Sequence, residues 1–130
     1  MKPIYKLLLS GCIVIALYDV LGSIISKQFN FNYAYLSLGS LFIYGLGGYW
    51  GTRTNNLKNG VLVAGCIGLF DSFVGWKISM LLHANTGSIK NTPTTLVWII
   101  SIIVLIGFAT LCGLLGGLIA NLFKKKLVNT

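Results

Sequence analysis

Acidic residues are almost missing from this chain of 130 residues, which has two aspartates and ten basic residues. Charged residues make up 9% of the sequence and hydrophobic residues 55%, with a mean hydropathy of +0.84. Soluble domains carry about 25% charged residues, so the charges present cannot cover a soluble surface of this size. Disorder is excluded as well, because disordered segments combine low hydrophobicity with many charges. The composition therefore predicts an integral membrane protein.

Residues that usually form catalytic or metal sites are also scarce. The one histidine, His83, falls at the end of an apolar run, where a solvated side chain is the ordinary interpretation. Cys12, Cys66 and Cys112 lie inside apolar runs without metal-ligand spacing, and we interpret them as small buried hydrophobic residues. No phosphate-binding loop, zinc signature or Ser-His-Asp set can be assembled. We therefore predict no enzyme activity, no catalytic residue, no metal and no cofactor.

Four apolar runs match, or nearly match, the length needed to cross a bilayer, whose core of about 30 Å takes about 20 helical residues. They cover residues 4–26, 35–51, 61–82 and 96–123, and the second is short and rich in glycine. The fourth is long enough to require tilt or an extension beyond the membrane. The sequence predicts an all-α membrane protein with four transmembrane helices, forming a single membrane domain over residues 1–130.

Basic residues gather on one predicted side of the membrane. The N-terminus, the 52–60 loop and the C-terminus share this side and hold most of the lysines and the arginine. By the positive-inside rule, both termini are predicted to be cytoplasmic. Lys124, Lys125 and Lys126 are expected to contact anionic lipid headgroups. Because no basic face with interleaved aromatic residues is present, nucleic acid is not an expected partner.

The two predicted hairpins, residues 1–56 and 57–130, resemble each other. The Gly-Cys-Ile at residues 11–13 recurs at 65–67, and Tyr-Asp at 18–19 recurs as Phe-Asp at 70–71. The glycine-rich stretch at 45–48 has a counterpart at 113–117. Because each hairpin returns to the same side, we predict a duplication with parallel repeats, which would place equivalent surfaces face to face. The other interpretation is that glycine-rich apolar helices resemble each other by composition.

One glycine-rich stretch also resembles other proteins. It reads Gly-Gly-Tyr-Trp-Gly-Thr-Arg at residues 47–53 and continues with Gly60, Gly65 and Gly68. This is similar to a loose class of small, uncharacterised bacterial and archaeal membrane proteins with four helices. In that class a Gly-Gly-x-x-x-Gly hairpin runs through a short basic loop into a second glycine-spaced helix. The resemblance implies a fold and transfers no functional residue.

The two aspartates, Asp19 and Asp71, both lie inside predicted spans. A charged side chain there costs about 2.5–3.5 kcal/mol on insertion scales, which makes each a candidate functional residue. Helical spacing places both on faces of small residues, so the carboxyl groups are predicted to face the bundle interior or a self-association interface rather than lipid. They are either structural groups bonded to neighbouring helices, or ligands for a proton or cation on a transport path. An intramembrane aspartyl protease is disfavoured, because Phe70 stands where its second motif has glycine.

Other residues of the spans bear on packing. Lys77 either extends to the outer headgroups or pairs with Asp19, which is predicted to lie at a similar depth. Glycines at four-residue spacing allow helix backbones to approach closely, within one chain or between chains. The glycines expected to serve in packing are Gly47, Gly51, Gly68, Gly75, Gly113 and Gly117.

Few residues lie outside the predicted spans, so function is expected from lateral association or from passage through the membrane. The first hypothesis is a non-enzymatic protein acting through helix–helix association, as an accessory or immunity-type subunit or a self-associating component. The alternative is a small oligomeric proton- or cation-coupled transporter or channel that uses Asp19 and Asp71. Expected partners are membrane lipids and either further copies of the chain or a larger membrane protein. Compact loops and the lack of an Asn-x-Ser/Thr sequon favour a bacterial inner membrane.

Overall fold

The computed structural model describes residues 2–87 and 94–128, the last three of these by their backbone alone. Within these ranges the chain forms four α-helices and one short 3-10 helix, η1, and no strand. The elements are α1 (Pro3–Phe29), η1 (Tyr33–Leu36), α2 (Ser37–Thr54), α3 (Leu57–Leu81) and α4 (Thr95–Val128). The predicted all-α class is confirmed.

Asparagines set the ends of the helices in both short turns. Asn30 ends α1 in the left-handed conformation with φ 53°, which asparagine adopts more readily than most residues. The side chain of Asn32 accepts a hydrogen bond from Ala34 N over 2.9 Å at the start of η1. Asn56 accepts one from Asn59 N, also over 2.9 Å, at the start of α3. These caps satisfy backbone N–H groups that a helix start leaves free.

Three of the helices, α1, α3 and α4, are long and apolar enough to cross a membrane. The fourth, α2, has 18 residues and is less apolar, so three of the four predicted spans have the length and composition of membrane helices. Its surroundings explain its composition, because α2 packs on α1, α3 and α4. A helix covered on most sides needs apolar residues only on its free stripe. That stripe consists of Leu38, Phe42, Leu46 and Trp50.

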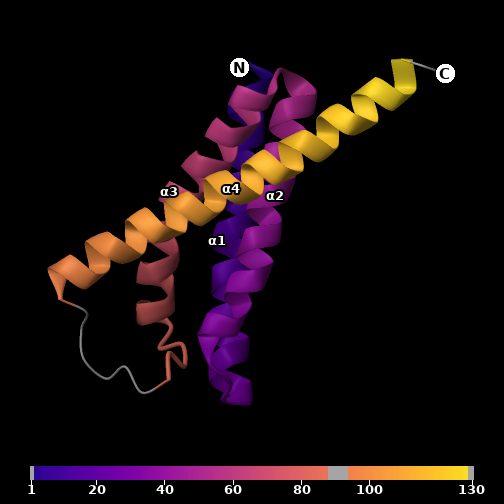
Figure 1. Ribbon diagram of the computed structural model, residues 1–130. Helices are drawn as coiled ribbons and strands as arrows, with labels where there is room; N and C mark the ends of the chain where they lie inside the picture. Colours follow the sequence, from indigo (N-terminus) through magenta and orange to yellow (C-terminus); the bar gives the residue numbers. More distant parts are fainter. Residues whose placement is uncertain (1, 88–93, 129–130) are drawn as a thin grey trace.

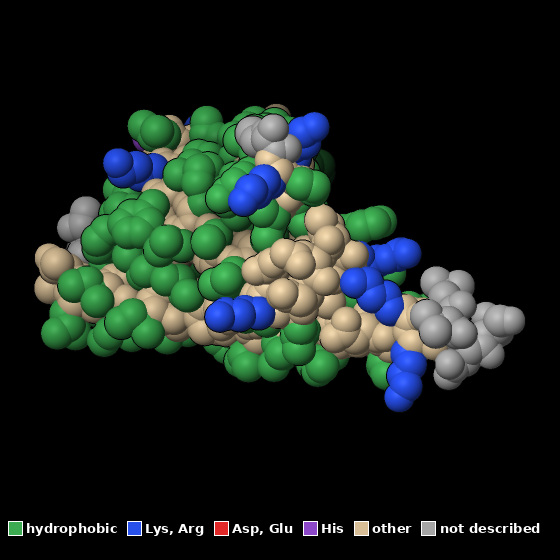
Figure 2. All heavy atoms as spheres, turned by 90° about the horizontal axis from the view of Figure 1, so that it is seen from above, with side chains coloured by type: hydrophobic (Ala, Val, Ile, Leu, Met, Phe, Trp, Pro, Cys, Tyr) green, Lys and Arg blue, Asp and Glu red, His purple; other side chains and the backbone are tan. Residues whose placement is uncertain are grey.

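The N-terminus, the turn between α2 and α3, and the end of α4 lie at one end of the molecule (Figure 1). The turn between α1 and α2, the residues that follow α3 up to 87 and the start of α4 lie toward the opposite end (Figure 1), as the pattern of runs predicts. Figure 2 views the molecule from the first end, and lysine and arginine side chains are spread around it. We call this the basic end, and the opposite one the far end.

Helix α4 crosses the other helices obliquely (Figure 1). It packs on α2 and α3, and in the part of the chain that the structure describes it has no packing contact with α1. Its 34 residues extend over about 50 Å, against about 30 Å for a bilayer core. Tilt in the membrane, or an extension beyond it, remains a prediction for this helix.

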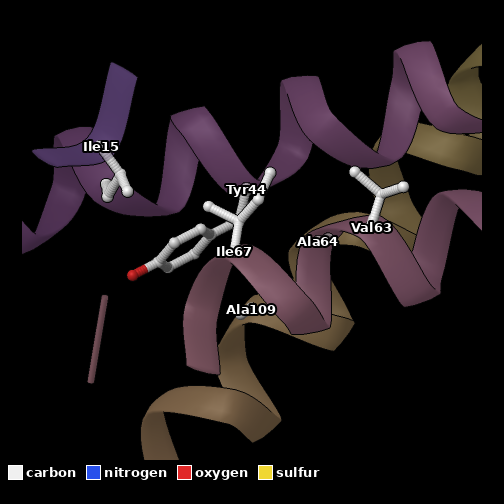
Figure 3. Close-up of a cluster of buried hydrophobic side chains, with 6 residues drawn as sticks. All are labelled: Ile15, Tyr44, Val63, Ala64, Ile67 and Ala109. Carbon is white, nitrogen blue, oxygen red and sulfur yellow. The ribbon is translucent and has the colours of Figure 1, made fainter. Parts of the chain in front are cut away.

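Close contacts between small residues hold the helices together. A Cβ added to Gly51 would lie 2.8 Å from the Cα of Gly60, and one added to Gly48 would overlap the backbone of Gly113. Such contacts bring helix backbones together and leave little room for a large core. The buried hydrophobic core is accordingly small (Figure 3), and consists of Ile15, Tyr44, Val63, Ala64, Ile67 and Ala109.

Large apolar side chains cover the outside of the molecule instead. All four helices expose leucine, isoleucine, valine or aromatic residues, and these fill much of the face in Figure 2. Extended exposed apolar surface of this kind marks a surface that binds another apolar phase. Together with the three membrane-length helices, it indicates a membrane protein.

Candidate functional site

The two aspartates meet between α1 and α3. Asp19 is 3% exposed and Asp71 is 8% exposed, so the prediction that both carboxyl groups face the interior is confirmed. One oxygen of each carboxyl group lies against Gly75, so the two groups are close neighbours. A Cβ added to Gly75 would lie 2.6 Å from Asp19 Oδ2 and would overlap Asp71 Oδ1. Gly75 therefore leaves the space in which the two carboxyl groups, called here the carboxyl pair, come together.

Two tyrosine hydroxyls bind the outer oxygens of the carboxyl pair. Tyr33 Oη donates a hydrogen bond to Asp19 Oδ1 over 2.9 Å. Tyr44 Oη donates one to Asp71 Oδ2. The four side chains come from α1, η1, α2 and α3, so this one cluster joins three of the four α-helices.

The surrounding fold fixes both tyrosines. Tyr44 is 1% exposed, and its hydroxyl points away from Val63 and Ala64 (Figure 3). The backbone N–H of Tyr33 donates to Asn85 O over 2.7 Å, which ties η1 to the segment after α3. Burial and the adjacent Asp19 raise the pKa of Tyr33, so its hydroxyl remains a hydrogen-bond donor over a wide pH range.

No hydrogen-bond donor from the described residues reaches Asp19 Oδ2. This oxygen and Asp71 Oδ1 both face the space beside Gly75. Both are acceptors when ionised, so they cannot bond to each other unless a proton or another positively charged donor joins them. A buried polar atom without a partner is uncommon, and such an atom calls for an explanation. The carboxyl pair therefore has the chemistry of a proton or cation site.

A cavity of about 620 Å³ lies beside the carboxyl pair, between α2, α3 and the first half of α4. It reaches Tyr33 in η1 and Thr86 after α3, at the far end of the molecule. Its polar wall includes Asp19, Tyr33, Ser40, Tyr44, Asp71, Ser72 and Ser79. Its apolar wall includes Trp76, Trp98, Ile102, Leu105 and Phe108. The cavity is thus amphipathic, with its acidic groups on one side.

Lys77 does not join this site. Its side chain is exposed on α3, whereas Asp19 is buried in contact with Tyr33 and Asp71. The pairing of Lys77 with Asp19 is therefore not formed. The physical reason is that Lys77 follows Asp71 by six residues, which turns it to another side of the helix.

The three lysines that were predicted to bind lipid headgroups differ in their surroundings. Lys124 Nζ donates a hydrogen bond to the backbone carbonyl of Thr52 over 2.9 Å, so this ammonium binds the end of α2. Lys125 is exposed. The side chain of Lys126 lies outside the described residues. A headgroup contact therefore remains a prediction for Lys125 and Lys126, while Lys124 has a partner inside the protein.

The predicted packing glycines lie at contacts within the chain. An added Cβ would lie 3.0 Å from Ile67 at Gly47 and 2.6 Å from Leu57 at Gly117. At Gly68 it would overlap Ala109, and at Gly113 it would overlap Ala64. Gly51 meets Gly60, as described above, and Gly75 lies at the carboxyl pair.

One prediction about the cysteines is wrong. Cys66 is exposed on α3, while Cys12 and Cys112 are half-buried. A thiol of this small size can face lipid as readily as a core, because a membrane protein has apolar surroundings on both sides. In the described ranges no group of three or more His, Cys, Asp or Glu residues lies together as a metal site.

Tyr33, Tyr44 and Trp98 were not predicted as site residues. The two tyrosines lie 14 and 27 residues from their carboxyl partners along the chain, so no local spacing links them. The tyrosine next to Asp19 in the sequence is misleading, because Tyr18 Oη donates to Leu36 O over 2.7 Å. Only the tertiary arrangement of η1, α2 and α4 brings these side chains to the site.

Comparison of the chain with known protein families, with curated proteins and with solved structures found no match. The class of the protein is therefore defined by its helices and its site. It has an apolar helical bundle with a buried carboxyl pair beside an amphipathic cavity.

Proposed function

We propose that this chain is a small proton-coupled transporter, in which the carboxyl pair binds and releases the coupling proton. One observation carries the proposal: the two acidic residues, from separate helices, lie buried side by side at Gly75, next to a cavity. In this proposal all four helices cross the membrane and both termini are cytoplasmic. A bacterial inner membrane is the proposed location, a homo-oligomer among lipids is the proposed assembly, and the cargo undergoes no chemical reaction.

Electrostatics explains why a proton belongs in the pair. Two unit charges about 4 Å apart repel by about 4 kcal/mol even at an effective dielectric constant of about 20. Two carboxylates that share a site therefore resist being ionised together, and one proton between them removes the repulsion. The hydroxyls of Tyr33 and Tyr44 donate to the outer oxygens and stabilise the single charge that remains.

The depth of the pair also supports transport. Asp19 lies about 24 Å along α1 from Pro3, and Asp71 about 21 Å along α3 from Leu57. Both positions fall within the apolar helices, so in the proposed arrangement the pair would lie inside a membrane core about 30 Å thick. The cavity leads from the pair to the far end, and glycine contacts such as that of Gly51 close the basic end. We propose that the proton enters this conformation from the far end.

The association hypothesis receives less support. It relied on the predicted packing glycines, which are engaged by other helices of the same chain. Those residues are therefore not available to hold a partner protein. The aspartates, in contrast, keep an oxygen that no described residue donates to, and they lie next to a cavity, which structural hydrogen bonding alone does not explain.

The proposal is tested by recording charge movement when a proton binds. Proteoliposomes adsorbed on a solid-supported membrane would receive a rapid acid jump, and the transient current would be recorded. We expect a current from the unmodified protein and from Lys77→Gln, which changes an exposed charge on the same helix. The Asp19→Asn/Asp71→Asn double variant, shown to be folded by gel filtration and circular dichroism, should give the current of empty liposomes. An equal current from the double variant, or none from the unmodified protein, would overturn the proposal.

A further inference from the structure

We propose that the site takes an amphipathic organic ammonium ion, which places its N–H groups on the facing carboxyl oxygens and its apolar body against α4. This inference rests on the proposed function of the carboxyl pair as a proton site. It adds the chemical class of the substrate and its orientation in the cavity.

The carboxyl pair supplies the charge and the geometry for an ammonium group. Asp19 Oδ2 is buried, has no donor among the described residues, and faces the same space as Asp71 Oδ1. An ammonium carries positive charge and several N–H donors, so it can bond to both oxygens at once. Hydrogen bonds between charged groups are roughly twice as strong as those between neutral groups. A quaternary ammonium would supply the charge and no donor.

The apolar part of the cavity wall suits an apolar, aromatic body. The rings of Trp76 and Trp98 lie 5.9 Å apart between centroids, with their planes inclined by 46°. Ile102, Leu105 and Phe108 continue this wall along α4. Binding sites of about 300–1,000 Å³ with mainly apolar walls and a few convergent polar groups are typical of small-molecule sites. A cavity of about 620 Å³ falls in this range.

Trp98 adds a second polar anchor. Its Nε1 is buried and has no hydrogen-bond acceptor among the described residues, although the indole lines the cavity. Buried indole N–H groups normally find an acceptor. A ligand with an oxygen on its apolar body would satisfy this donor while its ammonium binds the carboxyl pair.

The ammonium ion and the proton would exchange with each other, because both would occupy the space between the facing carboxyl oxygens. The oxygens that bind the ammonium are the ones that hold the proton between them in the free protein. Each ammonium ion that binds therefore displaces one proton, and the total charge of the site stays the same. This exchange would couple the movement of the ammonium ion to that of a proton.

The test is a fluorescence titration in detergent at pH 7 with three matched probes. They are 2-phenylethylammonium, the neutral 2-phenylethanol, and trimethyl(2-phenylethyl)ammonium, which is charged and lacks N–H groups. Trp50→Phe serves as the background, because Trp50 lies exposed on the outward stripe of α2 and would add an unrelated signal. We expect saturable quenching by 2-phenylethylammonium, and binding at least about tenfold weaker for the other two probes. Trp98→Phe should remove much of the fluorescence change.

Three other results of the titration would overturn the inference. Equal binding of 2-phenylethanol would mean that the cavity does not select a charge, and equal binding of the trimethyl probe would exclude the N–H contacts. Absence of saturable quenching would exclude an ammonium site. Asp19→Asn should weaken binding of 2-phenylethylammonium about tenfold, and the three-probe comparison remains decisive if that variant does not fold. Acid-jump currents test the proton site separately, so a normal current with failed ammonium binding would reject this inference alone.

Discussion

Replacing Gly75 by alanine adds one methyl group at the carboxyl pair and so tests whether the two carboxyl groups lie against this glycine. The added Cβ would lie 2.6 Å from Asp19 Oδ2 and would overlap Asp71 Oδ1. Carbon and oxygen atoms in ordinary contact are more than 3 Å apart, so at least one carboxyl group must move. Both carboxyl groups are buried and bonded to tyrosine hydroxyls, which resist that movement.

The size of the effect follows from comparison with Gly107→Ala. Gly107 also lies inside a helix, and nothing lies within 4 Å of its added Cβ. Both substitutions gain about 1 kcal/mol from the better helix propensity of alanine. Extra methyl groups in a packed site typically cost about 1–3 kcal/mol. The propensity gain cancels between the two variants, so Gly75→Ala should be less stable than Gly107→Ala by about 1–3 kcal/mol.

The assay is unfolding in mixed micelles by increasing amounts of sodium dodecyl sulfate, followed by circular dichroism. Gly75→Ala should unfold at a lower detergent fraction than Gly107→Ala, and its acid-jump current should be reduced. If the two variants were equally stable and gave equal currents, Gly75 would not lie between two closely placed carboxyl groups.

Three further predictions concern the residues around the pair and the basic end, with unfolding free energy measured in the same assay. Tyr44→Phe keeps the ring and removes a buried donor, so the unfolding free energy should fall by about 0.5–1.5 kcal/mol. An unchanged stability would contradict the hydrogen bond from Tyr44 to the Asp71 carboxyl group. Lys124→Met should lose about 1 kcal/mol because the Thr52 carbonyl loses its ammonium donor, whereas the exposed Lys125→Met should lose nothing. Folding raises the pKa of Tyr33, so the unfolded chain releases this proton first as the pH rises above about 10. Stability should therefore fall above that pH, and Tyr33→Phe should reduce the fall; an identical decline in both proteins would exclude Tyr33 as its cause.

Much of the fold follows from hydropathy and charge. Long apolar runs can satisfy their backbone groups in a membrane only as helices, so the helical class and its approximate boundaries are predictable. The short, glycine-rich second run is harder to predict from hydropathy. Its helix, α2, is covered by three helices and needs only the stripe containing Leu38 and Phe42 to be apolar. Its role in the centre of the packing depends on the oblique path of α4, which no local pattern specifies.

The two aspartates of the site are predictable from the sequence, whereas the residues that reach them through tertiary contacts are not. Two lone carboxyl groups in apolar spans are costly, and the small residues around Asp19 and Asp71 indicate the interior face of each helix. The tyrosine partners and the apolar wall depend on η1 and α4, whose distances from the aspartates along the chain give no signal. The predicted duplication of the two hairpins remains a prediction.

The shared proton is tested most directly by infrared difference spectroscopy of the protein in lipid bilayers, recorded between acid and alkaline pH. We predict the carbonyl band of one protonated carboxyl group per chain, shifted in D₂O and absent from the Asp19→Asn/Asp71→Asn variant. Lys77→Gln, the matched change of an exposed charge, should keep the band. A spectrum in which both aspartates are ionised throughout, or a band that persists in the double variant, would contradict a proton held by this pair.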